Sequence, residues 1–181
     1  MGNNTWENLL DPHHTARGSA KNTFTSIQDV SPTQIPTSYA NELKLGTKID
    51  VEAYGEFSTT GTPTLAIGVY YGAVAQVWNS GTITTGSAAA AWPWHLRWSG
   101  IVTTVNGASS VIYGHGILDL GTSLTAFASS AVPTTAAARS VTVDTTAAKS
   151  WGIAATWGTS SASNSITVDI LNVHLLNQGK T

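Results

Sequence analysis

The sequence predicts an all-β protein, an antiparallel jelly-roll-like β-sandwich of about eight strands at residues 23–181, preceded by an N-terminal arm at residues 1–22. Three observations lead to this prediction. Apolar and polar residues alternate over short segments, Gly, Ser, Thr and Asn separate these segments at intervals of about 8 to 12 residues, and no long helix is indicated. A parallel α/β sheet is excluded because its crossover connections require helices.

The arm lacks a strand pattern. Trp6, Leu9 and Leu10 are spaced as on one side of a helical turn, which Asp11 and Pro12 close. A single turn of helix is not stable alone in water, so these three apolar side chains need a surface to bury against. That surface belongs to a neighbouring chain or to the protein's own sandwich, unless the arm is disordered, as termini commonly are.

The first half of the predicted sandwich centres on one hairpin. A strand at residues 23–29 is followed by a crossing at residues 31–39, whose prolines keep it out of a central strand. Strands at residues 48–58 and 64–71 alternate clearly and flank a turn at residues 60–63, so they predict the clearest hairpin of the chain. The first of them places Ile49, Val51, Ala53 and Phe57 on one face and Lys48, Asp50, Glu52, Tyr54 and Glu56 on the other; the second points Leu65, Ile67, Val69 and Tyr71 inward.

The second half is rich in tryptophan. A short strand at residues 74–78 precedes a long one at residues 92–105, and the Asn106-Gly107 pair then predicts a hairpin turn into a strand at residues 110–118. The remaining strands are expected at residues 124–127, 139–144, 149–157 and 165–176. The apolar face shifts within the last of these, which indicates a bulge.

The composition excludes several classes of function. Charged residues are only 10% of the chain against a typical value of roughly 25%, and the formal net charge is −2, so the broad basic surface of a nucleic-acid-binding protein is not expected. There are no cysteines, hence no disulfides, thiolate ligands or cysteine nucleophile. Residues 1–17 form neither a signal peptide nor a membrane span, so we expect synthesis in a cytoplasm and no membrane partner. A hydroxyl-rich, weakly charged surface suits a protein whose faces are covered by partners.

Neither the histidines nor the acids predict catalysis. The histidines are scattered rather than clustered with acids, so we expect no metal site; His115, between two glycines, is interpreted as a partly buried sheet residue rather than a ligand. Alternate acids on one strand could flank a sugar as in glycosidases, but a solvated face is the stronger interpretation. No nucleophile elbow or P-loop is present, and we expect no enzyme activity and no cofactor. The histidines are His13, His14, His95, His115 and His174, and the acids are Asp50, Glu52 and Glu56.

The row Trp92, Trp94 and Trp98 allows two interpretations. Exposed indoles would make a platform for sugar rings, whereas buried indoles would belong to the core or to a subunit interface. The three residues share one face of their strand with Leu96, which favours burial.

Several motifs resemble a group of small structural proteins of tailed bacteriophages, mostly phages of actinobacteria. The resemblance runs over residues 23–176, and Leu9-Leu10-Asp11 is similar to the start of the N-terminal segment of that group. The motifs are Gly61-Thr62-Pro63-Thr64-Leu65, Gly68-Val69-Tyr70-Tyr71-Gly72, Trp92-Pro93-Trp94 and the segment 156–164 (TWGTSSASN).

The resemblance implies a jelly-roll virion component without catalytic residues. The expected function is that of a capsid decoration, or cement, protein on the outer surface of the phage head. Its expected partners are the major capsid protein and further copies of itself in a homotrimer, with Trp6, Leu9 and Leu10 as the docking arm. The alternative is a receptor- or carbohydrate-binding module of a tail fibre, with a glycan held by Trp92, Trp94 and Trp98.

Overall fold

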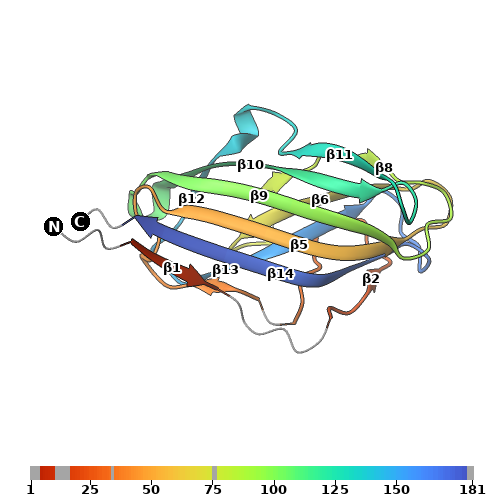
Figure 1. Ribbon diagram of the computed structural model, residues 1–181, viewed down its shortest axis with the longest axis horizontal. Coiled ribbons are helices and arrows are strands. Elements are labelled where there is room, and N and C mark those ends of the chain that lie inside the picture. Colours follow the sequence, from red (N-terminus) through yellow and green to blue (C-terminus); the bar gives the residue numbers. More distant parts are fainter. Residues whose placement is uncertain (1–4, 11–16, 34, 75–76, 179–181) are drawn as a thin grey trace.

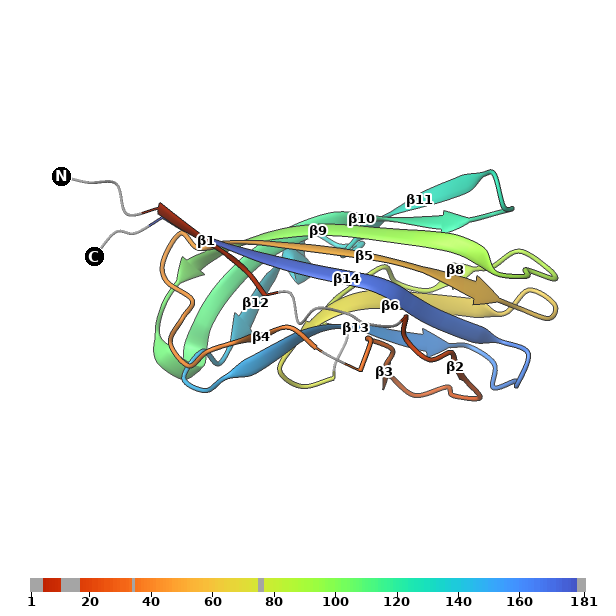
Figure 2. The same ribbon diagram turned by 60° about the horizontal axis from the view of Figure 1, so that its bottom comes forward.

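Two antiparallel β-sheets pack against each other in the computed structural model, which describes residues 5–10, 17–33, 35–74 and 77–178. Figures 1 and 2 show the two layers, with the long strands β5, β9, β10 and β14 side by side in one of them. The predicted β-sandwich is confirmed. The only helical segments among the described residues are two short 3-10 turns, Gly107–Ser109 and Ala137–Arg139.

Among the described residues, eight strands form the larger sheet and six form the smaller one. The larger sheet has the order β1 (Thr5–Leu9), β14 (Ser165–Gln178), β5 (Lys48–Ser58), β9 (Trp92–Thr104), β10 (Ser110–Gly121) and β11 (Phe127–Val132), with β12 (Ser140–Val143) also paired to β10 and β2 (Lys21–Asn22) to β14. The smaller sheet has the order β3 (Gln28–Asp29), β13 (Lys149–Trp157), β6 (Thr64–Tyr71) and β7 (Trp78–Asn79), with β4 (Thr37–Ser38) on β13 and β8 (Ile83–Thr84) on β6.

The strand order is that of a jelly roll. The chain alternates between the layers, with β3, β6, β7 and β13 in the smaller sheet and β5, β9 and β14 in the larger one, and the last strand returns between β1 and β5. The hairpin β9–β10, turned at Asn106 and Gly107 as predicted, then extends the larger sheet outward to β11 and β12.

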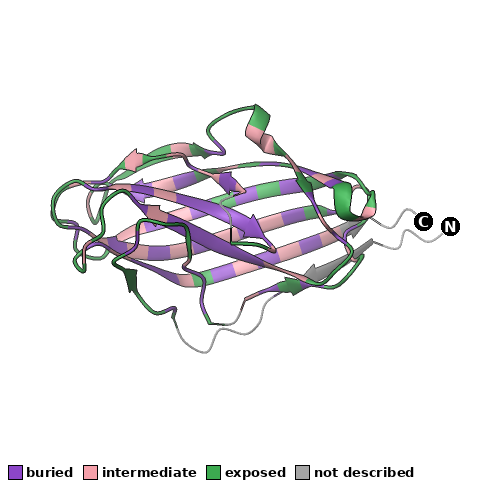
Figure 3. Cartoon of the chain, turned by 180° about the vertical axis from the view of Figure 1, so that it is seen from behind, coloured by how far each residue is buried: buried purple, intermediate pink, exposed green. Residues whose placement is uncertain are grey.

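Alternation along the strands builds the core. Figure 3 shows buried residues alternating with less buried ones along the long strands of the larger sheet. All the predicted inward residues of β5 and β6 are buried. Trp98 of the larger sheet reaches Trp78 of the smaller one, with ring centroids 4.5 Å apart, and Trp151 lies 6.2 Å from Trp98, so aromatic rings join the layers.

The predicted hairpin between residues 48 and 71 is wrong. β5 pairs with β14 and β9, whereas β6 pairs with β13, β7 and β8, so the turn between β5 and β6 crosses from one sheet to the other. The connection from β13 to β14 makes the same crossing. Alternation identifies the buried face of a strand but not its hydrogen-bonded neighbour, and a polar turn serves both kinds of connection.

The predicted helical turn in the arm is also wrong. Thr5–Leu9 is a strand that pairs antiparallel with β14, from Thr5 opposite Gln178 to Leu9 opposite His174. Leu10 is buried, and its backbone N–H donates to the carbonyl of Val173 at 2.8 Å. The edge of β14 supplies backbone partners that an isolated turn of helix lacks.

Other strand bounds differ from the prediction where the pattern is weak. Of the strand expected at residues 23–29, only Gln28–Asp29 (β3) is a strand, and β2 precedes this range. The described part of the range 74–78 contributes only Trp78, the first residue of β7. The strand expected at residues 124–127 begins only at Phe127. The bulge predicted in the last strand is confirmed by a register shift between Val168 and Ile170.

Candidate functional site

The outer face of the larger sheet is the open face of the sandwich. The outer face of the smaller sheet is partly covered. This is seen at Tyr70, which points outward from β6 but is only 2% exposed. Residues of the β3–β4 connection lie over it. The hydroxyl of Ser31 donates to the carbonyl of Ile153 and accepts a hydrogen bond from the N–H of Ile153. Burial raises the pKa of Tyr70, with the negative charge of Asp29 as a second cause.

Glu52 is at the centre of a polar cluster on the open face. The hydroxyl of Tyr54 donates to Glu52 Oε1 at 2.6 Å, and Nε2 of His95 lies 3.1 Å from the same oxygen. The ring of His95 stacks on Tyr54, with centroids 4.0 Å apart. The hydrogen bond from Tyr54 is the main cause that lowers the pKa of Glu52, and it raises the pKa of Tyr54.

The other acids of β5 are also paired with neighbours. Asp50 lies 2.7 Å from Nζ of Lys48 and accepts a hydrogen bond from Ser99. Glu56 lies 2.6 Å from Arg17, which also binds Asp169 at 2.9 Å. A glycosidase needs one carboxyl whose pKa is raised so that it can donate a proton. Glu52 does not fit that role, because its hydrogen bond from Tyr54 lowers its pKa.

A second cluster surrounds a small cavity between β9, β10 and β11. His95, Asp119 and Phe127 line a space of about 180 Å³. Asp119 accepts hydrogen bonds from Nη2 of Arg97 at 3.0 Å and from the hydroxyl of Ser129. The sequence analysis did not identify this site. The only sequence feature that points to it is Phe127, a single aromatic residue within a run of Ala, Ser and Thr.

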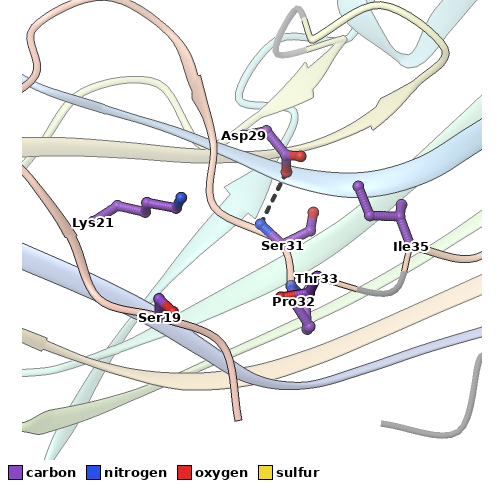
Figure 4. A pocket seen from close by; sticks show the side chains of 7 residues that line it. All are labelled: Ser19, Lys21, Asp29, Ser31, Pro32, Thr33 and Ile35. Carbon is purple, nitrogen blue, oxygen red and sulfur yellow. Dashed lines mark hydrogen bonds between the residues drawn. The ribbon is translucent and has the colours of Figure 1, made fainter. Parts of the chain in front are cut away.

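A larger cavity, of about 240 Å³, lies on the flank of the sandwich (Figure 4). Its polar groups serve the local backbone. Asp29 Oδ1 accepts the N–H of Ser31 at 2.9 Å, and Ser31 bonds to Ile153 as described above. This cavity is therefore best explained as a product of how the β3–β4 connection is anchored. Its lining residues are Ser19, Lys21, Asp29, Ser31, Pro32, Thr33 and Ile35.

The tryptophan row does not form a surface platform. Trp94 is 1% exposed and donates its Nε1–H to the carbonyl of Thr167 at 3.2 Å, and Trp98 is 2% exposed. Trp92 is half-buried and packs against the core beside Phe57. Burial, the favoured interpretation, therefore holds for Trp94 and Trp98, and neither can stack on a glycan in this fold.

The remaining candidate residues are spread over the molecule. In the arm, Leu10 is buried, Trp6 and Leu9 lie on β1 beside β14, and His13 and His14 fall outside the described residues. His115 is exposed on β10, contrary to the expected partial burial, and His174 lies opposite Asp50.

Among the described residues, no group of three His, Cys, Asp or Glu side chains could hold a metal ion. Within the same part of the chain, no helix has the length and apolar character needed to cross a membrane. No protein-family model matches the sequence, and no curated protein matches it.

Proposed function

We propose that this protein is a non-enzymatic structural component of a tailed-phage virion, a decoration protein that binds the outer surface of the head and stabilises it. The observation that carries the proposal is the open face of the larger sheet, where large apolar side chains stand exposed among paired charges. The resemblance of several sequence motifs to phage structural proteins supports the biological setting of the proposal.

Five large apolar residues on this face are each 40% to 51% exposed: Ile101, Tyr113, Ile117, Phe127 and Ile170. Ile101 and Tyr113 are directly opposite each other on β9 and β10, and Ile117 is two outward positions beyond Tyr113. Apolar and aromatic residues with arginine are typical of the buried centre of a protein interface. A face of this composition favours a protein partner over a solvated role.

The pairing of charges supports the same proposal. Asp50, Glu52 and Glu56 already contact Lys48, His95 and Arg17, so a partner that covers the face does not bury isolated charges. If the protein binds the assembled head but not the free capsid subunits, its binding would stabilise the shell by mass action. We propose a homotrimer around a threefold axis as the bound form, with the major capsid protein beneath it.

The test is cosedimentation of the purified chain with heads that lack the decoration protein, and separately with tails, together with its mass in solution. The expected result is saturable binding to heads by a trimer. Binding to tails alone, or to neither particle, would contradict the proposal.

The contribution of the arm needs a shorter deletion than residues 1–22. Arg17 bridges two acids, and β2 pairs with β14, so removal of the whole arm disturbs the sandwich itself. Deletion of residues 1–9 keeps Leu10 and Arg17 in place. If the arm docks on the capsid, this variant melts cooperatively but loses head binding; unchanged binding would remove the arm from the proposed interface.

A further inference from the structure

The cavity between β9, β10 and β11 combines one exposed aromatic ring with preformed polar groups. Phe127, on the outermost strand, is 51% exposed, and its partner across the strand pair is Gly121, which has no side chain. Asp119 and His95 complete the lining, and the space is about 180 Å³. Pockets for drug-sized ligands span roughly 300 to 1,000 Å³, so this one suits a ligand of about one ring.

The polar groups are fixed before any ligand arrives. Arg97 and Ser129 each bind a different oxygen of Asp119. An ionised carboxylate has about four acceptor sites, so each oxygen can still accept a hydrogen bond from a ligand hydroxyl. Arg97 has further N–H donors, and His95 is held by Glu52 and by stacking on Tyr54. A pocket fixed in this way loses little conformational freedom on binding.

We propose that Phe127, Asp119 and His95 form a binding site for one neutral pyranose ring. A pyranose presents a C–H face that can pack on the ring of Phe127, and hydroxyls that can donate to Asp119. The carboxylate of Asp119 lines the cavity, which disfavours an anionic ligand such as a uronic acid. Arg97 already neutralises Asp119, which disfavours a cation such as choline.

The site does not rest on the proposed function. Because Phe127 also belongs to the face proposed to bind the head, a pyranose would bind here in the free chain, or on a head that leaves β11 uncovered. The site replaces the tryptophan row as the place where this chain would contact a glycan.

The experiment is a titration of the full-length, ¹⁵N-labelled protein followed by two-dimensional NMR. The probes are the methyl α-pyranosides of glucose, galactose and mannose, with glucuronate and choline as charged probes. The expected result is saturable shifts at the amides of Asp119, Phe127 and Ser129 with at least one neutral pyranoside, and weaker ones with both charged probes. No saturable shift at these amides with any pyranoside, or tighter binding of glucuronate or choline, would overturn the proposal.

Variants separate binding from folding. Phe127→Ala and Asp119→Asn should each weaken pyranoside binding by about tenfold or more. Tyr113→Ala is the matched control. Tyr113, on β10, is an exposed aromatic residue like Phe127, but it does not line the cavity. Equal affinity in Phe127→Ala and the wild type, with the amide spectrum otherwise unchanged, would also overturn the proposal.

Discussion

At the residue scale, two glycines make room for the central tryptophan of the core. Gly100 and Gly114 are directly opposite each other on β9 and β10, and the indole of Trp98 covers both. A Cβ at either position would overlap the ring of Trp98. The ring of Trp98 also packs against Trp78 and Trp151 of the smaller sheet, so a shift of this ring would disturb the packing between the two sheets.

Gly114→Ala should therefore lower the free energy of unfolding by about 1 to 3 kcal/mol, the usual cost of overpacking a core. Urea denaturation followed by tryptophan fluorescence measures this loss. His115→Ala is the control, because His115 is the next residue on β10 and is exposed, and it should stay within about 0.5 kcal/mol of the wild type. A loss as large in His115→Ala as in Gly114→Ala would contradict this account of the glycine pair.

Tyr54 controls the ionisation of Glu52. Because its hydroxyl bonds to the carboxylate, the pKa of Glu52 lies below its ordinary value of 4.5 in the folded chain. The hydrogen bond from Tyr54 to the ionised carboxylate of Glu52 therefore stabilises the fold above about pH 4.5, and this contribution is lost as the pH falls through the lower, folded-state pKa. Glu52 is partly exposed, so the contribution is at most about 1 kcal/mol.

Tyr54→Phe should keep the stack on His95 and remove the hydrogen bond. Carbon-detected NMR titration should then show the pKa of Glu52 moving up toward its ordinary value, and the small loss of stability seen near neutral pH should shrink in acid. An unchanged pKa would show that the hydroxyl is not the cause.

At the element scale, the two sheet-crossing connections are tied together by one buried side chain. Asn164, between β13 and β14, is 1% exposed; its Oδ1 accepts the N–H of Thr60, from the connection between β5 and β6, at 3.2 Å, and its Nδ2 donates to Thr159 at 3.1 Å. Asn164→Ala should cost about 1 to 3 kcal/mol, because the two hydrogen bonds that join the connections are lost. Thermal unfolding measures this, with the exposed Ser163→Ala as a near-neutral control; equal melting of both variants would contradict the role of Asn164.

Strong alternation of apolar and polar residues predicted the positions of the strands, but it did not predict which strands pair with each other. The bounds of β5, β6 and β13 follow from regular apolar patterns, and so does the hairpin at Asn106-Gly107. The partner of β1 is more than 160 residues away, and the apolar spacing of Trp6, Leu9 and Leu10 fits a helical turn as well as other conformations. Local pattern does not report such distant pairing.

The cavity could not be predicted for a related reason. Its residues come from three strands, and one of them, β11, has a weakly apolar sequence whose strand was placed too early in the chain. Asp119 and His95 become neighbours only through the β9–β10 register. The sequence shows outward positions on each strand, whereas the site depends on which of these positions meet across strands.

At the scale of the whole molecule, the two layers differ in what they leave open. The β3–β4 connection covers part of the smaller sheet, while the larger sheet keeps Ile101, Tyr113 and Ile117 exposed. If this face binds the head or a second copy, a charge at its centre should weaken that binding, because the charge would be buried in the interface. The same charge should not destabilise the fold, because Ile117 points away from the core.

Ile117→Glu should therefore weaken cosedimentation with heads by at least about tenfold, or dissociate the proposed trimer, with little change in melting temperature. Leu45→Glu is the matched control, since Leu45 is 63% exposed but lies outside the strands of the sandwich. Loss of binding in Ile117→Glu alone would place the interface on the larger sheet. Equal binding by both variants and the wild type would instead require contact through the ends or the smaller sheet, and the apolar residues of this face would then need another partner.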